Sequence, residues 1–335
     1  MYNAPSGGVL GFSGHATPGT RRVRRGKKRC LTRIARPHIG QTMIPYPDIS
    51  PDLLQLGPLR VRWYGIMYIL GFAAGRQILR WLCRQRFLRM NQDHVDDLLV
   101  SLFLGMLVGA RGLYMAVYYE PAEGEAWRWY TPFAVWQGGL AFHGGLLGML
   151  AAVWIFGRVK KVRFWNLADA LALASPVGLF LGRIGNFINA ELFGRETTVP
   201  WAMSFPVRDW DGSVLGWTSP RHPSQIYEAI GEGLLALALV WFLRRRVRFQ
   251  GMLIGAGVAW YGVARFVVEF FREKDPQMGY YFGWMTMGQI RCALMILGGV
   301  AMMLVARGRA VPVDAPHPGA EPDAPPPSAP APADA

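Results

Sequence analysis

The chain has 335 residues, of which 52% are apolar and only 17% charged, and its formal net charge is +14. Soluble domains carry about 25% charged residues, so this composition excludes an ordinary soluble enzyme and a wholly disordered chain. The three cysteines, Cys30, Cys83 and Cys292, are scattered without metal-ligand spacing, which argues against a disulfide scaffold. The apolar residues come in long runs, which predicts one polytopic membrane domain.

Seven apolar segments are long enough to cross a bilayer core of about 30 Å as helices. The fourth is the weakest, because Pro176 and Asp169 interrupt it, and Asp169 is expected to cap or pair locally. We therefore predict an all-α polytopic membrane protein with seven transmembrane helices, at Trp63–Leu82, Leu98–Tyr119, Leu140–Phe156, Trp165–Leu181, Ile226–Leu243, Met252–Phe271 and Met285–Val305.

Basic residues gather in alternate loops of this arrangement. Arginine or lysine clusters follow the first, third, fifth and seventh segments, whereas the loop after the second carries Glu120, Glu123 and Glu125. Short basic loops stay in the cytoplasm. We therefore expect the N-terminus outside and the C-terminus in the cytoplasm, with a periplasmic loop region between spans four and five.

Both ends of the chain differ from the apolar domain in composition. Residues 1–42 are strongly basic although the topology places them outside. A DNA-binding arm is one interpretation and a twin-arginine signal another, but the latter lacks the apolar segment that should follow. We expect instead that this extension is disordered or that translation starts at Met43. The transmembrane domain, 43–306, is followed by a Pro/Ala-rich tail, 307–335, expected to be disordered.

Ionisable residues of several predicted spans lie at one depth, near the outer face. Helix rise places Arg111 about 20 Å from the cytoplasmic end of its span, and Arg265 and Glu269 about 20 Å and 26 Å from the cytoplasmic end of theirs. His143 opens the third span and Arg183 closes the fourth, both at the outer face. Such residues are costly inside a membrane, so their shared depth predicts a functional site.

Simpler interpretations of these residues stay open. Arg265 and Glu269 are spaced for an internal ion pair, and Glu228 and Glu232 share a helix face by the same spacing. A histidine at the end of a span is more often an interfacial hydrogen bonder than a catalyst. The glycine run Gly144–Gly148 is typical of close helix packing.

The segment 182–223 is interpreted as a loop rich in groups that bind oxyanions or hydroxyls. Arg183 offers a fork matched to phosphate oxygens, and Asn186, Asn189 and Glu191 follow it closely. A loop whose polar groups satisfy its own turns is an equal alternative. The sequence contains no H-E-x-x-H, G-x-S-x-G or Walker motif, so a metalloprotease, a serine hydrolase and a nucleotide-driven pump have no support.

The run Gly182–Arg195, GRIGNFINAELFGR, closely resembles the signature of bacterial prolipoprotein diacylglyceryl transferases. Four other stretches match the same family in order, Trp63–Gly65, Phe142–Gly145, Arg221–Glu228 and Tyr261–Arg272. The resemblance extends from about Ile44 to Val305. It implies an inner-membrane enzyme of lipoprotein maturation with seven spans. Such enzymes move the diacylglyceryl group of phosphatidylglycerol to the lipobox cysteine thiol of a preprolipoprotein and release glycerol 1-phosphate.

Roles for individual residues follow from this resemblance. Arg183 is expected to bind the lipid phosphate and Arg265 the leaving group or headgroup. His143 is our candidate base for the thiol, although an arginine could lower the thiol pKa without any base. No metal or organic cofactor and no nucleic acid is expected. The partners are phosphatidylglycerol, the signal peptide with its lipobox cysteine, and the bilayer. The expected substrate-binding residues are Arg183, Asn186, Asn189, Glu191, Gly194, Tyr64, Tyr261, Glu269 and His222.

A transporter or flippase of an anionic amphiphile is the alternative from another functional class, and a scaffold that organises lipids is a third. Transporters usually show repeated halves and broken helices near the membrane midplane. No repeat is visible in this sequence, and the polar residues gather near one face. The pattern therefore favours an interfacial enzyme.

Overall fold

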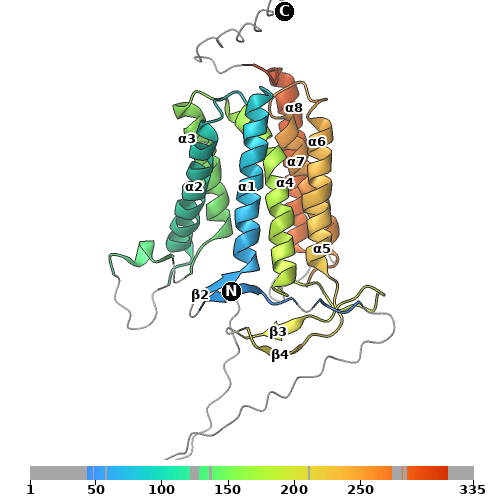
Figure 1. Ribbon diagram of the computed structural model, residues 1–335. Helices are drawn as coiled ribbons and strands as arrows, with labels where there is room; N and C mark the ends of the chain where they lie inside the picture. Colours follow the sequence, from blue (N-terminus) through green and yellow to red (C-terminus); the bar gives the residue numbers. More distant parts are fainter. Residues whose placement is uncertain are drawn as a thin grey trace, which may run out of the picture. The chain divides into compact units, whose positions relative to one another are not determined.

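The fold is described by a computed structural model (Figure 1) over residues 44–47, 49–56, 59–120, 128–135, 138–209, 212–273, 281 and 285–315. All of these residues belong to one unit of the chain, residues 36–335. The basic extension predicted at 1–42 lies outside the described residues, as does most of the Pro/Ala-rich tail.

Long helical segments dominate this part of the chain, and they correspond to the seven predicted spans (Figure 1). Six of them, all except α1, are long and apolar enough to cross a membrane, which is the pattern of a polytopic membrane protein. Helix α1 carries Arg76 and Arg80, which lower its hydropathy. The segments are α1 (Trp63–Arg84), α2 (His94–Val117), α3 (Phe142–Val159), α4 (Phe164–Ile188), the continuous run of α5 (Ser224–Glu228), η3 (Ala229–Leu235) and α6 (Ala236–Leu243), then α7 (Met252–Glu269) and α8 (Met287–Arg309).

Helix α4 corrects the sequence-based boundary between the fourth span and the following loop. The span was predicted to end at Leu181, but the helix continues through Pro176 and Leu181 as far as Ile188. The hydroxyl of Tyr46 donates hydrogen bonds of 2.9 Å to the carbonyl oxygens of Phe187 and Ile188. Terminal carbonyls of a helix need such partners, so Tyr46 stabilises an end that the local sequence does not mark.

Helices α2 and α3 approach closely along a line of glycines. Gly105 and Gly109 of α2 face Gly148 and Gly144 of α3, and a Cβ atom on Gly105 would lie only 2.6 Å from the carbonyl oxygen of Gly148. Small residues allow two transmembrane helices to pack with their backbones in contact. The interpretation of the Gly144–Gly148 run as a helix-packing surface is therefore confirmed.

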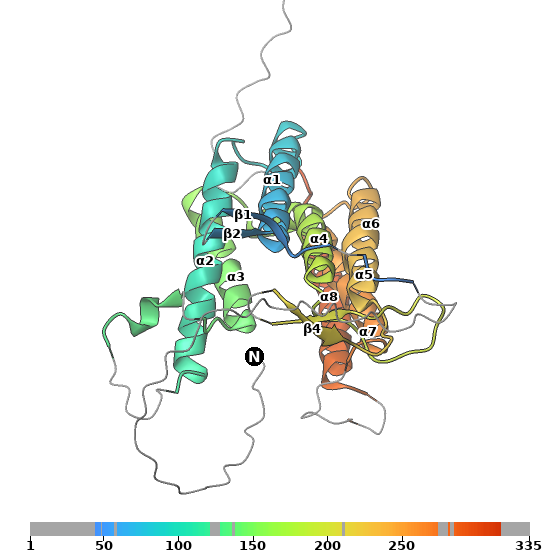
Figure 2. The ribbon, with the colours of Figure 1, turned by 60° about the horizontal axis from the view of Figure 1, so that its bottom comes forward.

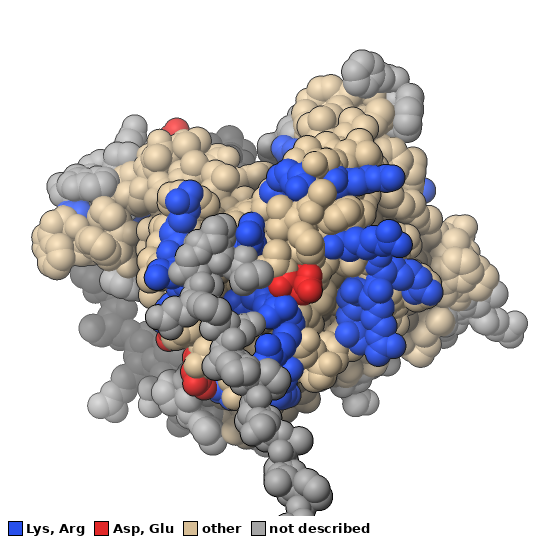
Figure 3. Space-filling model, turned by 90° about the horizontal axis from the view of Figure 1, so that it is seen from above, with Lys and Arg blue, Asp and Glu red and all other residues tan. Residues whose placement is uncertain are grey.

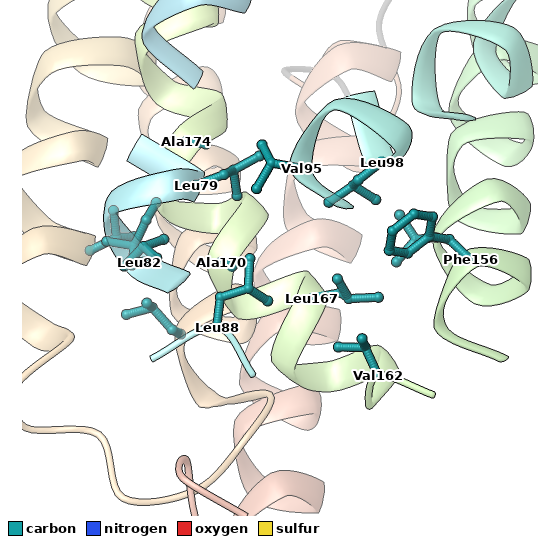
Figure 4. Packing of buried hydrophobic residues seen from close by; sticks show 14 residues of the cluster. Leu79, Leu82, Leu88, Val95, Leu98, Phe156, Val162, Leu167, Ala170 and Ala174 are labelled. Atoms are coloured by element: carbon teal, nitrogen blue, oxygen red, sulfur yellow. The ribbon is translucent and has the colours of Figure 1, made fainter. Parts of the chain in front are cut away.

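A buried apolar cluster joins the first four helices at one end (Figure 4). It contains the C-terminal part of α1, the beginning of α2, the end of α3 and the beginning of α4. Because this cluster occupies one end of the helices, the other end is available for polar groups. Its labelled members include Leu79, Leu82, Leu88, Val95, Leu98, Phe156, Val162 and Leu167.

Two small antiparallel sheets, absent from the all-α prediction, lie at the opposite end (Figures 1 and 2). Strand β1 (Asp52–Leu56) pairs with β2 (Leu59–Arg62), and β3 (Pro206–Arg208) pairs with β4 (Val214–Trp217). Each strand is too short to leave a clear alternating pattern. Beside them Tyr46, Phe205 and Ala190 form a second buried cluster.

The C-terminal tail begins later than predicted. Helix α8 continues to Arg309, and the chain after it pairs with the α6–α7 connection. The backbone N–H of Gln250 donates to the carbonyl oxygen of Val311 at 2.9 Å, and that of Val313 donates to Arg248 at 3.1 Å. Residues 307–315 are thus helical or hydrogen-bonded, whereas 316–335 lie outside the described residues.

Asp169 caps a helix, as expected, although the helix is not its own. It is fully buried in α4, and its two carboxylate oxygens accept the backbone N–H groups of Gly251 at 2.7 Å and Ile254 at 2.8 Å. These groups belong to the beginning of α7, where N–H donors lack intrahelical partners. The carboxylate therefore fixes α7 against α4.

Replacing Asp169 by alanine should lower the thermal stability of the protein in detergent, because two buried N–H donors lose their acceptor. The expected loss is about 1–3 kcal/mol of unfolding free energy. Asp93→Ala is the matched control, since Asp93 is exposed and its side chain makes no capping hydrogen bond. Equal melting temperatures for the two variants would contradict this role of Asp169.

Candidate active site

Two glutamates with no exposed surface lie at the beginning of the fifth span. Glu228 ends α5 and Glu232 lies in η3, a π-helical segment. π-Helical turns are rare and often occur at functional sites. A buried carboxylate is costly unless it is paired, so these two side chains require cationic partners.

Arginines from two other helices supply this pairing. Arg183 of α4 places one terminal nitrogen 2.9 Å from Glu228 and the other 3.1 Å from Glu232. Arg265 of α7 approaches the same carboxylates, at 2.7 Å and 3.4 Å. Two arginines that are distant in sequence therefore share one pair of buried carboxylates.

A third arginine and a third glutamate complete the cluster. Arg272, just after α7, lies 2.5 Å from Glu228 and 3.7 Å from Glu269. The i,i+4 pair of Arg265 and Glu269 is longer, at 3.6 Å, than the contact of Arg265 with Glu228. Arg265 is therefore held chiefly by another helix, and the simple intrahelical ion pair is not its main interaction. Three arginines and three glutamates give this arginine–glutamate cluster a formal charge of zero.

The two kinds of side chain differ in exposure. The side chains of Glu228 and Glu232 are fully buried, whereas those of Arg183 and Arg265 are 18% and 20% exposed. A guanidinium group has five N–H donors, more than these ion pairs engage. The buried carboxylates thus hold the arginines, and the partly exposed guanidinium groups keep N–H donors of the kind that bind phosphate oxygens.

The chain forms a tight turn directly after α4. One carboxylate oxygen of Glu191 accepts hydrogen bonds from the amides of Asn186, at 2.8 Å, and Asn189, at 3.3 Å. Ala190 and Leu192 both adopt left-handed φ angles of 56°, which costs about 1–2 kcal/mol for each L-residue. The hydrogen bonds to Glu191 help to offset that cost, so these three polar residues form one unit.

Gly194 and His222 join this turn to α5 and to the end of α7. The backbone N–H of Gly194 donates to the carbonyl oxygen of His222 at 2.9 Å, and the N–H of His222 donates to that of Arg195 at 3.0 Å. The N–H of Arg195 in turn donates to the carbonyl oxygen of Phe271 at 3.0 Å. A Cβ atom on Gly194 would lie 2.9 Å from the Cβ of His222 and would press on the carbonyl oxygen of Phe271. The imidazole of His222 is buried, with Nδ1 3.2 Å from the hydroxyl of Tyr227.

Two tyrosines expected at the site lie beside it. The ring of Tyr64, at the beginning of α1, lies against Gly185, where a Cβ atom would be 2.9 Å from it. Gly185 is directly followed in α4 by Asn186, so the ring of Tyr64 lies close to the turn that Glu191 holds. Tyr261 lies one turn before Arg265 on α7, within electrostatic range of Glu232 and Arg183.

His143 lies apart from the arginine–glutamate cluster. It is exposed at the first turn of α3, and its ring contacts Phe142 with 5.7 Å between centroids. Among the described residues, no hydrogen bond or ion pair connects it to Arg183 or Arg265.

Arg111 is not part of the cluster either, contrary to the prediction from its depth. It is buried, and it donates to the backbone carbonyls of Thr131 at 2.6 Å, Pro132 at 2.9 Å and Gly138 at 2.7 Å. Its guanidinium thus holds the connection between α2 and α3. Helix rise gives the depth of a residue but not the direction in which its side chain points.

Sequence reasoning gave no role to Arg272, although it lies within a stretch that carried the family resemblance. A usable indication existed, because Arg272 follows Arg265 by seven residues and Glu269 by three. On a continued helix that spacing would place all three on one face, although in the structure α7 ends at Glu269 and Arg272 follows it.

The fold and the site together define a polytopic membrane protein with a buried arginine–glutamate cluster at one end of its helices. Residues 51–305 match the family model described as prolipoprotein diacylglyceryl transferase. The chain is 44% identical over 275 residues to the phosphatidylglycerol–prolipoprotein diacylglyceryl transferase of Nitratidesulfovibrio vulgaris (strain DSM 19637 / Miyazaki F), covering 80% of this chain and 97% of that protein. The proteins of the same name from Azotobacter vinelandii and Methylococcus capsulatus are 44% and 43% identical, over 80% of this chain and 98% and 99% of theirs.

The chain therefore belongs to the prolipoprotein diacylglyceryl transferase family, and the family assignment made from the sequence is confirmed.

The buried imidazole of His222 should make stability depend on pH. Burial, and then the charge of Arg195, lower its pKa below the ordinary 6.5. The unfolded chain therefore binds more protons below about pH 6.5, and stability should fall as the pH decreases from there. Melting temperatures between pH 7.5 and pH 5 should fall less steeply for His222→Gln. His143→Gln, at an exposed histidine, is the control, and an equal slope in all three proteins would contradict this account.

Proposed function

We propose that this chain transfers the diacylglyceryl group of phosphatidylglycerol to the lipobox cysteine of preprolipoproteins. The names of its relatives, phosphatidylglycerol–prolipoprotein diacylglyceryl transferases, support the donor and the class of acceptor. The observation that carries the proposal is the meeting of Arg183 and Arg265 on Glu228 and Glu232. This arrangement presents two cations from different helices to one anionic headgroup.

The reaction requires charge stabilisation at the phosphate. The cysteine sulfur forms a bond to the glycerol carbon of the diacylglyceryl group, and the bond from this carbon to the phosphate oxygen breaks. The phosphodiester leaves as the monoester glycerol 1-phosphate, and the thiol proton passes to a base. Negative charge grows on the leaving phosphate, so preorganised arginines act where charge develops.

Arg183 and Arg265 take this role in the proposal: Arg183 binds the lipid phosphate, and Arg265 stabilises the charge that the same phosphate gains as it leaves in glycerol 1-phosphate. Glu228, Glu232 and Glu269 hold the guanidinium groups in place. Such fixed donors need no reorganisation during the reaction. The partial exposure of both arginines supports access by the headgroup.

The unit of Asn186, Asn189 and Glu191 binds glycerol hydroxyls in the proposal, next to Arg183 on the same helix end. Tyr64 and Tyr261 line the lipid site from α1 and α7. Gly194 and His222 act by holding the turn after α4 against the end of α7.

We also propose that α1 crosses the membrane in addition to the six other helical segments, which brings the number of spans to seven. With an odd number of spans, the N-terminus lies outside and the C-terminus in the cytoplasm. Arg84 and the basic residues after α3 and α6 then lie on the cytoplasmic side. The arginine–glutamate cluster lies towards the outer leaflet of the inner membrane, where a lipobox peptide is presented after export.

Purified protein, phosphatidylglycerol and a lipobox peptide should suffice to release glycerol phosphate, without added nucleotide or metal. The released glycerol phosphate is measured directly, together with the mass gained by the peptide. A folded sample that releases none would contradict the transfer, and protein that only moves the lipid between leaflets would support a flippase instead.

Arg183→Lys keeps the positive charge but loses the fork that reaches Glu228, Glu232 and a phosphate together. We expect kcat/KM for transfer to fall about 100-fold or more, since hydrogen bonds to a developing charge contribute about 3 kcal/mol. Arg246→Lys is the matched control, because Arg246 stacks on Phe242 away from the cluster. Turnover near the wild-type value in Arg183→Lys would refute bidentate phosphate binding.

His143→Gln tests the thiol base. General base catalysis typically contributes about 10²–10⁴-fold, so kcat should fall by at least 100-fold at pH 7 if His143 accepts the proton. Raising the pH towards the thiol pKa should restore much of the rate. Unchanged turnover at pH 7 would remove this role from His143 and leave the arginine sites unaffected.

A further inference from the structure

A cavity of about 280 Å³ lies at the end of the helices opposite the arginine–glutamate cluster. The last turns of α3 and the first residues of α4 form its walls, including Trp154, Arg158, Arg163 and Trp165. Arg183 lies about 28 Å further along α4 from this cavity. The cavity is therefore separate from the candidate active site, and the proposed reaction gives it no role.

The lining of this α3–α4 cavity combines the aromatic rings of Trp154, Phe164 and Trp165 with the cations Arg158 and Arg163. The guanidinium of Arg158 lies 5.2 Å from the ring centre of Trp154, and that of Arg309 lies 4.4 Å from that of Trp165. A cavity with such walls favours an anion.

The side chains just beside the cavity are apolar and exposed. Trp154, Ile155 and Val159 of α3 are 53%, 53% and 71% exposed. In a membrane protein such residues face lipid chains, and tryptophan concentrates at the level of the headgroups. The α3–α4 cavity thus lies where acyl chains end and headgroups begin.

The whole end of the molecule around the cavity is basic. Figure 3 shows this end with many Lys and Arg side chains and few acidic ones. A general excess of positive charge attracts anionic lipids over the surface as a whole. A walled cavity adds a place where one headgroup is held, and basic pockets between transmembrane helices on the cytoplasmic side bind anionic headgroups.

We propose that the α3–α4 cavity binds the phosphate of an anionic phospholipid from the leaflet at this end, with Arg158 as its main cation. The exposed apolar residues beside it favour a lipid over a free phosphate ion, because they accommodate the acyl chains. The site rests on the proposed position of the protein in the bilayer and not on the proposed chemistry.

Photo-crosslinking in liposomes tests this site. The full-length protein is reconstituted into phosphatidylcholine that contains a small fraction of phosphatidylglycerol with a photoreactive acyl chain, and labelled peptides are mapped by mass spectrometry. We expect label on residues 154–165. Arg158→Gln should reduce that label about tenfold, the effect of about 1.4 kcal/mol, and Trp154→Leu should reduce it as well.

Arg246→Gln is the matched control, because it removes one charge from a basic loop without altering the cavity. Three results would overturn the proposal: equal labelling by photoreactive phosphatidylcholine, an equal loss in Arg246→Gln, or complete competition by inorganic phosphate. The last would assign the cavity to a soluble anion. Arg158→Gln should keep wild-type transfer of the diacylglyceryl group. Missing label in an active enzyme thus rejects only the cavity, and normal label in an inactive enzyme rejects only the proposed reaction.

Discussion

The pairing of two buried glutamates with two arginines is the constraint on which the arrangement of the helices depends. Removing a carboxylate and a guanidinium from water costs several kcal/mol for each ion, and only close pairing compensates. Glu228 and Glu232 have no exposed surface. Arg183 and Arg265 must therefore stay beside them, which fixes α4 and α7 relative to the fifth span. The same requirement holds both guanidinium groups at one place, with part of each side chain exposed.

The surrounding structure supports this cluster from the side of the loops. Tyr46 holds the last carbonyl groups of α4, and Glu191 gathers the amides of Asn186 and Asn189. The backbone strip through Gly194 and His222 then connects that turn to the end of α7. The apolar cluster at the opposite end packs α1 to α4 together and leaves the polar end free for the site.

Hydropathy was enough to predict the helical segments and their order, because long apolar runs have few alternatives in a membrane. The end of α4 and the two small sheets were missed, since they depend on distant partners such as Tyr46. Depth along a helix placed Arg265 and Glu228 correctly near one level, yet it also suggested Arg111, which instead binds backbone carbonyls. The sequence gives the spacing of residues along a helix and hence their depth. The direction in which a side chain points, and the helix that it contacts, depend on how the helices pack.

The most direct test of shared anion binding is a double-mutant cycle on transfer activity with Arg183→Gln and Arg265→Gln. If both arginines act on one phosphate and through the same carboxylates, their effects must be strongly coupled. We predict that each single variant lowers kcat/KM by about 100-fold or more. The kcat/KM of the double variant should lie within about tenfold of that of the less active single variant. Losses that multiply fully in the double variant would contradict a common site.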